Sequence, residues 1–227
     1  NKGMKRFLIV MLAVMALMLP VTASAATTKS KAIAAYKAML SKSTLVWKDV
    51  DGNAVTWDSN ATMKTSDLKF ALVYLDNDSV PELVVKSSFE LSAIHRSGQM
   101  MIYTYKNGNV SYVATIRDLG ASTSGTFRYY PKKGIFIDND YSKGWDCVHY
   151  MRFSNGKASE WMSRYRNYAD DRQKIGKTTS WLSQSTGLKQ ITSKCFNNQL
   201  NKYAGSAALV KKGLCRNTSA NRSKWLK

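Results

Sequence analysis

Four turn signals divide the middle of the chain into pairs of short, β-prone runs. The turns are centred on 76–81, 106–109, 131–134 and 154–156, and each lies between runs rich in β-branched and aromatic residues. The Asn-Gly pair at 107–108 is the strongest of these signals, because the type I′ hairpin turn needs a positive φ at both central positions. Successive hairpins place sequential strands side by side, so the spacing predicts a meander of about eight antiparallel strands.

Helical periodicity precedes this β-prone region. Ile33, Tyr36 and Leu40 recur at helical spacing within the segment 29–41, which predicts one amphipathic helix. The expected fold class is therefore α+β. It combines an antiparallel multi-hairpin meander sheet, similar to a propeller blade, with an N-terminal helix and C-terminal helices.

The C-terminal part returns to a helical pattern. Thr192 or Ser193 is positioned to cap a helix that places Phe196 and Tyr203 on one face and ends at Gly205. A final helix is expected over 219–227, after a capping threonine at 218. The intervening segment, 207–215, fits a short strand pair or an extended link.

The chain begins with a segment typical of a secretory signal. Lys5 and Arg6 precede an apolar run over 7–19, and the small residues Ala23-Ser24-Ala25 follow. We expect residues 1–25 to be removed, residues 1–3 lying upstream of the natural start, and the rest to be secreted without a transmembrane anchor. An uncleaved membrane anchor is the alternative. The expected domains are 26–171, a helix with hairpins, and 172–227, a basic helical part packed on it.

Positive charge is concentrated towards the C-terminus. Lys and Arg number 34 against 15 Asp and Glu, a formal charge of +19, and the segment 172–227 contains no carboxylate. Such a one-sided field favours an anionic partner. Expected partners are teichoic acid and sulfated or sialylated glycans at a cell envelope or in mucus; nucleic acid is possible but not favoured, and anionic membrane lipid is a further alternative. Solubility without a specific ligand would also explain the charge.

The residues expected to contact such a polymer are basic, and most belong to the C-terminal part. They are Arg164, Arg166, Arg172, Lys174, Lys177, Lys211, Lys212, Arg216, Arg222 and Lys224. On this interpretation the protein is a secreted, non-catalytic binding protein.

The turn at 76–81 carries the most specific local motif. Asp76 and Asp78 present carboxylates two residues apart, and the carbonyl of Val80 and the carboxylate of Glu82 follow at the same spacing. Because calcium prefers six to eight oxygen ligands, these groups predict only a weak structural calcium site, with a dissociation constant on the order of millimolar. The alternative is a turn in which the Asp side chains bind their own backbone.

This motif resembles the calcium-binding hairpin loops of FG-GAP and VCBS-type propeller repeats. Tyr74 stands where those loops have their first carboxylate, which weakens the expected site. The sequence Leu-Asp-Asn-Asp at 75–78 is echoed as Ile-Asp-Asn-Asp at 137–140. Together with the C-terminal segment 217–227, the hairpin also resembles uncharacterised secreted proteins of gut Firmicutes, which implies a location and an architecture but no activity.

A catalytic interpretation centres on Cys147 and His149, two residues apart on a predicted strand and therefore on one face of it. A neighbouring imidazole can activate a thiol. The resulting alternative function is an extracellular hydrolase acting on cell wall or glycan, with this pair or with carboxylates drawn from Asp138, Asp140, Asp146 or Glu160. We favour a half-buried Cys beside a surface His, and so predict no catalytic residues.

The chain has three cysteines, and their pairing stays open. Export would permit a disulfide between Cys195 and Cys215. Three unpaired thiols, with Cys147 as the third, are the alternative.

Overall fold

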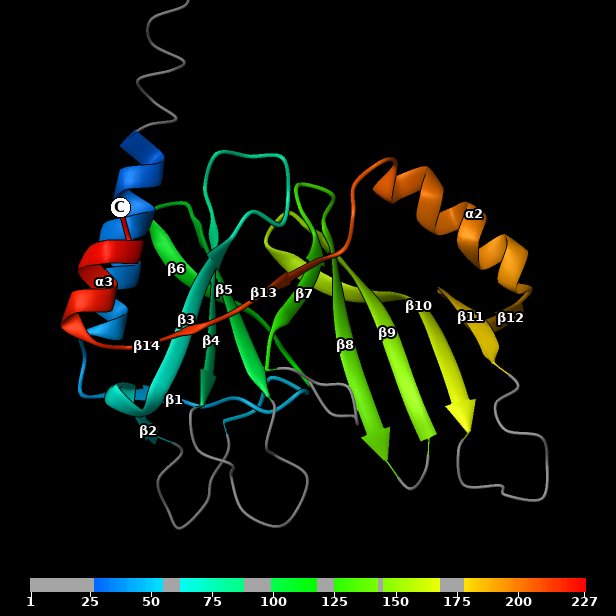
Figure 1. Ribbon diagram of the computed structural model, residues 1–227, viewed down its shortest axis with the longest axis horizontal. Coiled ribbons are helices and arrows are strands. Elements are labelled where there is room, and N and C mark those ends of the chain that lie inside the picture. The colour runs from blue at the N-terminus through cyan, green and yellow to red at the C-terminus, as the bar shows by residue number, and fades with distance from the viewer. Residues whose placement is uncertain (1–26, 55–61, 88–98, 118–124, 143–144, 168–177) are drawn as a thin grey trace, which may run out of the picture.

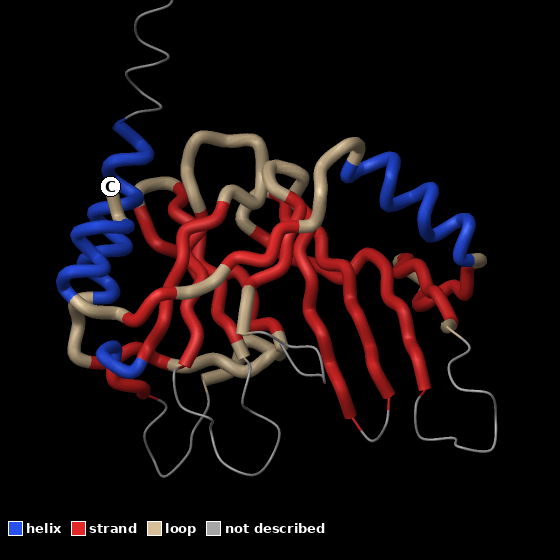
Figure 2. The backbone as a smooth tube through the Cα atoms, in the orientation of Figure 1, coloured by secondary structure: helices blue, strands red, loops and turns tan. Residues whose placement is uncertain are grey.

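The computed structural model describes residues 27–54, 62–87, 99–117, 125–142, 145–167 and 178–227. In these ranges the fold is α+β and consists mainly of antiparallel strands, as predicted (Figures 1 and 2). Residues 27–40 are helical, and the other helices are the 3-10 turn η1 (Thr65–Asp67), α2 (Ser193–Ala204) and α3 (Ser219–Trp225). The predicted signal peptide lies outside the described residues.

The strands form two large sheets and one small one. Their bounds are β1 Thr44–Val46, β2 Thr62–Lys64, β3 Leu68–Val73, β4 Glu82–Ser87, β5 Met100–Lys106, β6 Asn109–Ile116, β7 Phe127–Tyr130, β8 Ile135–Ser142, β9 Trp145–Ser154, β10 Lys157–Asn167, β11 Thr179–Gln184, β12 Gly187–Ile191, β13 Val210–Lys212 and β14 Cys215–Arg216. The five-stranded sheet has the order β14-β3-β4-β5-β6, and the seven-stranded sheet has the order β12-β11-β10-β9-β8-β7-β13. Each is a meander extended by a strand from the C-terminal segment.

The predicted hairpin turns explain this register. Asn107 and Gly108 both have positive φ, as do Asn155 and Gly156, so each Asn-Gly pair forms the turn that suits twisted antiparallel strands. Gly134 is required for a different reason. A Cβ there would lie 2.5 Å from the carbonyl oxygen of Phe153 on β9, at a φ of 62° that already favours glycine.

Two apolar clusters hold the layers together. One joins the sheets, with Val84 and Ile102 of the five-stranded sheet packed against Phe136 and Phe153 of the other. The second covers the opposite face of the five-stranded sheet, where Tyr36 and its helical neighbours pack. The seven-stranded sheet extends beyond the shared core (Figure 1), which leaves β9 and β10 free to carry polar side chains on that face.

The C-terminal segment links both sheets. β13 pairs with β7, whereas β14 pairs with β3. The segment is then fixed by Asn217, whose side-chain amide donates to the carbonyl oxygens of Leu40 and Thr65, both at 2.8 Å. Leu226, fully buried after α3, enters the same core as Tyr36. The predicted segment 207–215 therefore supplies two strands that do not pair with each other.

The helix caps agree with the sequence, but one hairpin was not predicted. Thr192 and Thr218 cap α2 and α3 by accepting the backbone N–H groups of Cys195 and Asn221, and Gly205 follows α2. β11 and β12 lie in a region expected to be helical. All of β12 except its last residue is exposed, so it has no alternating apolar pattern to reveal it.

Candidate functional site

Three adjacent strands of the seven-stranded sheet present polar side chains on one face. Cys147 of β9 lies between Asp140 of β8 and Tyr165 of β10. His149 lies between Asp138 and Ser163 in the same manner. Directly paired residues share a face, so the meander brings together groups from three segments of the chain.

A β-bulge aligns Glu160 with Ser163 and Tyr165 on this face. The pairing of β10 with β9 shifts between Glu160 and Met162, so that Glu160 is opposite Met151 while Ser163 is opposite His149. With strict alternation, Glu160 and Ser163 would face opposite ways, because they are three residues apart. The bulged residue, Trp161, instead contacts Tyr203 of α2 on the other side, with ring centroids 5.1 Å apart.

The result is a thiol–imidazole–carboxylate chain. The Sγ atom of Cys147 is 2.9 Å from Nε2 of His149, and Nδ1 of His149 is 3.0 Å from Oε2 of Glu160. The base therefore contacts the candidate nucleophile with one nitrogen and an orienting carboxylate with the other. This is the arrangement by which a nucleophile is activated in hydrolases on unrelated folds.

The electrostatics of the cluster favour a charged imidazole. Burial by itself would lower the pKa of His149, but the hydrogen bonds and charges of Cys147 and Glu160 outweigh it and raise that pKa to about 10. The same contact with His149 lowers the pKa of Glu160, against the opposing effect of its partial burial. A positively charged imidazole in contact with a sulfur atom is the arrangement that catalytic cysteine sites use.

Tyr165 completes the surroundings of the sulfur. Burial and the hydrogen bond with Cys147 raise the pKa of its hydroxyl to about 12, so the hydroxyl keeps its proton at neutral pH. The side chains are increasingly exposed from the thiol to the carboxylate. Cys147 is 7% exposed, and the side chains of His149 and Glu160 are 12% and 30% exposed.

The other carboxylates on this face are held by Arg117. Its guanidinium binds Asp138 at 2.8 Å and Asp140 at 2.7 Å, and its backbone N–H donates to Asp138. Arg117 follows β6, so these bonds tie the edge of the five-stranded sheet to β8. Both carboxylates are therefore bound to one guanidinium instead of being arranged around an open space, as a glycosidase would require.

The opposite face of the sheet is covered by α2. Tyr150 and Arg164 pack against Phe196, and the Arg152 guanidinium contacts the rings of both Trp161 and Tyr203. Arg164 also donates to the side-chain oxygen of Asn197 at 2.6 Å. The guanidinium of Arg164, expected to contact a polymer, is thus used to hold α2 on the sheet.

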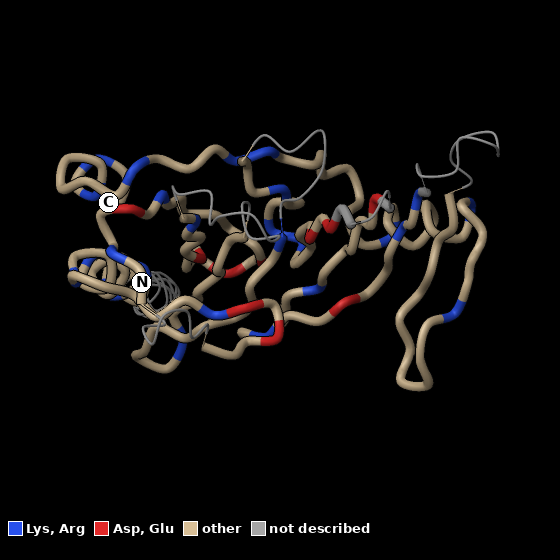
Figure 3. Tube along the Cα trace, turned by 90° about the horizontal axis from the view of Figure 1, so that it is seen from below, with Lys and Arg blue, Asp and Glu red and all other residues tan. Residues whose placement is uncertain are grey.

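The remaining expected contact residues are distributed along the chain. Arg166 is exposed at the end of β10, whereas Lys211, Lys212 and Arg216 belong to β13 and β14. Arg222 and Lys224 lie on α3, at the end of the molecule opposite to α2 (Figure 1). Arg172, Lys174 and Lys177 are outside the described residues. Of the expected contact residues, Lys212 and Lys224 both lie near Cys215. Other Lys and Arg residues are spread over the described part of the molecule (Figure 3).

In the predicted calcium loop, the carboxylates have partners within the protein. Asp76 accepts the backbone N–H of Asp78, and Asp78 accepts that of Val80 at 2.7 Å, as in a self-bonded Asp turn. Glu82 is 1% exposed and accepts from the backbone N–H of Leu75 and the hydroxyl of Thr104. Among the described residues, no group of three or more His, Cys, Asp or Glu is arranged to hold a metal ion. Calcium binding stays a prediction.

The three cysteines, all within described segments, are free thiols. Cys195 lies in the first turn of α2 and Cys215 on β14, in two different parts of the molecule. The thiol of Cys215 donates to the carbonyl oxygen of Phe70 at 3.5 Å. Of the two alternatives, the structure therefore shows three unpaired thiols.

Comparison with known proteins identifies no relative. No family model matches the chain, and no curated protein matches it. A solved structure described as a Xanthomonas type IV secretion system related protein aligns with a TM-score of 0.39 and 12% identity, covering 55% of this chain and 58% of that chain. The resemblance to VCBS-type hairpins stays a prediction. Within the described ranges, no helix is long and apolar enough to cross a membrane.

Proposed function

We propose that the protein is an extracellular hydrolase that uses Cys147 as its nucleophile. The observation that carries this proposal is the continuous contact from Cys147 through His149 to Glu160, at 2.9 and 3.0 Å. The sequence alone identifies the first two residues as a pair and favours a half-buried thiol beside a surface imidazole. Glu160 converts that pair into a chain in which the base is both oriented and charged.

The chemistry of such a site is acyl transfer. The thiolate of Cys147 attacks the carbonyl carbon of an ester or amide, forming a C–S bond, and the imidazolium of His149 gives its proton to the leaving oxygen or nitrogen. Water, losing its proton to His149, then attacks the thioester, which releases the carboxylic acid and restores the thiolate beside the imidazolium. Glu160 keeps the imidazole oriented and stabilises its positive charge throughout.

This mechanism restricts the type of bond that the protein can cleave. A thiolate attacks an electrophilic carbonyl carbon, whereas a glycosidic bond is cleaved by an acid and a second carboxylate. Since Asp138 and Asp140 are both engaged by Arg117, the geometry favours acyl bonds over glycosidic bonds. In a cell envelope, the corresponding targets are the peptide amides of the wall and the ester groups carried by glycans.

The test compares the protein with its Cys147→Ala variant on a purified wall preparation and on p-nitrophenyl acetate. We expect release of free amines or of nitrophenol, and its loss in the variant. Cys195→Ala and Cys215→Ala are matched controls that should retain the activity. Turnover that survives in Cys147→Ala would refute the proposal, as would the absence of turnover together with alkylation of Cys147 by iodoacetamide no faster than that of Cys195.

A further inference from the structure

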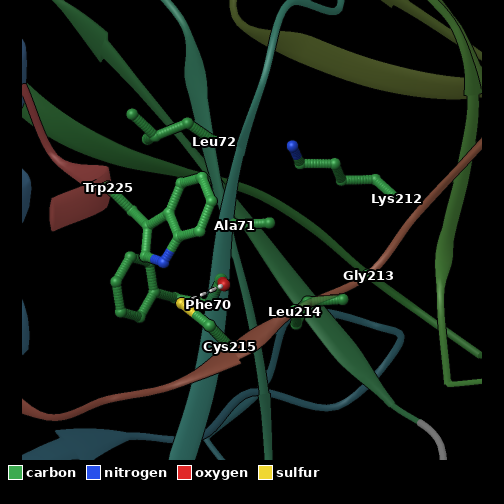
Figure 4. Close-up of a pocket in the computed structure, with 8 residues that line it drawn as sticks. All are labelled: Phe70, Ala71, Leu72, Lys212, Gly213, Leu214, Cys215 and Trp225. Atoms are coloured by element: carbon green, nitrogen blue, oxygen red, sulfur yellow. Dashed lines mark hydrogen bonds between the residues drawn. The ribbon is translucent and has the colours of Figure 1, made fainter. Parts of the chain in front are cut away.

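A pocket lies on the edge of the five-stranded sheet, where the C-terminal segment crosses from one sheet to the other. Its volume is about 260 Å³, and its lining residues are Phe70, Ala71, Leu72, Lys212, Gly213, Leu214, Cys215 and Trp225. Figure 4 shows the indole of Trp225 and the amine of Lys212 on either side of the β3 backbone near Ala71. The pocket is separate from Cys147 and its partners.

The aromatic ring is presented outward by its position in the fold. Leu226 is fully buried in the core beside the N-terminal helix, and the preceding residue, Trp225, is 53% exposed. An exposed indole in the lining of a pocket offers a flat apolar face on which the ring of a ligand can stack. The ammonium of Lys224 lies 4.8 Å from the Trp225 ring centroid, which adds positive charge beside the ring.

The electrostatics of the pocket are one-sided. Lys212 is the charged member of its lining, which includes no carboxylate. Burial raises the pKa of the Cys215 thiol, so that side chain contributes a neutral surface. The exposed residues Lys211 and Arg216 lie next to the lining in sequence and increase the positive field.

We propose that this pocket binds one sugar ring of a polysaccharide that carries carboxylate groups, with the ring on Trp225 and the carboxylate on Lys212. The volume is just below the range of about 300–1,000 Å³ typical of sites that enclose a whole small molecule, which suits one unit of a polymer. The indole of Trp225 favours a partner that contains rings, because a ring can stack on it. A glycerol-phosphate chain contains no ring. This binding activity goes beyond the proposed hydrolysis and does not depend on it.

The chain offers matched variants for the test. Lys212 lines the pocket and Lys211, the preceding residue on β13, does not, so Lys212→Ala and Lys211→Ala remove the same charge at two adjacent positions. Gly213 has open space where a side chain would lie, and its φ is outside the left-handed region. Gly213→Asp therefore adds a negative charge to the lining without strain, and Gly213→Asn is its neutral counterpart.

Binding is measured by calorimetry with a hexagalacturonate, a neutral hexagalactose, a poly(glycerol phosphate) and a single-stranded oligonucleotide. The Cys147→Ala protein is used alongside the native protein, so that loss of hydrolysis and loss of binding are distinguishable. We expect the hexagalacturonate to bind most tightly. Lys212→Ala, Trp225→Ala and Gly213→Asp should each weaken it by about tenfold or more, and Lys211→Ala and Gly213→Asn by less than about twofold.

Three results would overturn the proposal. The first is equal loss in Lys211→Ala and Lys212→Ala, because it would show a diffuse field instead of a site. The second is tighter binding of the glycerol-phosphate polymer or of the oligonucleotide. The third is full retention of hexagalacturonate binding in Trp225→Ala, with circular dichroism showing that each variant is folded.

Discussion

Glu160 contacts His149 across a β-bulge, with 3.0 Å between its Oε2 atom and the imidazole Nδ1 atom. Glu160 is opposite Met151 by the regular register of the hairpin, so it shares the face of His149. Without the extra residue at Trp161, the alternation of β10 would place Arg164 instead of Tyr165 opposite Cys147. The bulge therefore decides whether the Tyr165 hydroxyl joins the carboxylate and the thiol on this face. Bulges that redirect a side chain in this way are common next to active sites.

The first prediction concerns the charge on His149. Cys147 and Glu160 together raise the imidazole pKa to about 10, and Glu160→Gln removes the carboxylate, so we expect that pKa to fall towards its ordinary value of 6.5. An NMR titration of the imidazole protons measures the change directly. Asp146→Asn removes the carboxylate of the residue that precedes Cys147 on β9, and it should shift the His149 pKa far less. An unchanged pKa in Glu160→Gln would remove Glu160 from the site.

Tyr165 provides the second prediction, because its protonated hydroxyl lies beside the Cys147 sulfur. A donor in this place can stabilise the oxyanion formed when the thiolate attacks a carbonyl, and loss of one such donor lowers kcat by about 10²-fold. We expect Tyr165→Phe to lower kcat towards p-nitrophenyl acetate by that order, with little effect on KM. Tyr150→Phe is the control, since Tyr150 packs on Phe196 behind the sheet. Equal kcat values for the two variants would assign Tyr165 a packing role.

Much of this fold could be predicted from local signals. The Asn-Gly pairs at 107–108 and 155–156 specify tight hairpins, and the alternating runs around them specify strands. Thr192, Gly205 and Thr218 mark helix ends by their own hydrogen-bonding and conformational preferences. These features depend on neighbours in the sequence, so they can be predicted without a structure.

The unpredicted features depend on distant partners. β13 and β14 are two and three residues long, and their pairing with β7 and β3 is set by the packing of the whole C-terminal segment. The placement of Tyr165 opposite Cys147 depends on a bulge that no residue type marks. A hairpin alignment counted back from Asn155-Gly156 does place Glu160 opposite Met151, so the pairing register was the available signal for its proximity to His149.

Calcium binding at Asp76 and Asp78 gives a third prediction. Their backbone hydrogen bonds and the burial of Glu82 leave few free oxygens, so we expect a dissociation constant in the millimolar range. At ten times that concentration, a ligand specific to the folded state stabilises it by about 1.4 kcal/mol, a shift of a few °C in Tm. Calorimetric scans with calcium and with magnesium measure this shift, which Asp78→Asn should abolish. An identical shift in Asp78→Asn would place any bound calcium elsewhere.

The final prediction concerns stability and the buried carboxyl of Glu82. Burial raises its pKa to about 8, although the N–H of Leu75 and the hydroxyl of Thr104 partly counteract this. A pKa raised above the unfolded value means that the associated stability is complete below about pH 4.5 and is lost as the pH rises through about 8. The free energy of unfolding should therefore fall between pH 6 and pH 9, by an amount on the order of 1–3 kcal/mol.

Glu82→Gln tests this directly, because a neutral amide of similar shape has no proton to lose. Denaturant unfolding at pH 6 and pH 9 should show a smaller decrease for Glu82→Gln than for the native protein, with the variant gaining relative stability at the higher pH. Asp51→Asn removes an exposed carboxylate and should leave the native decrease unchanged. If the native protein and Glu82→Gln lost the same free energy over this range, the decrease would have to come from other groups, and Glu82 would be ionised in the fold at pH 6.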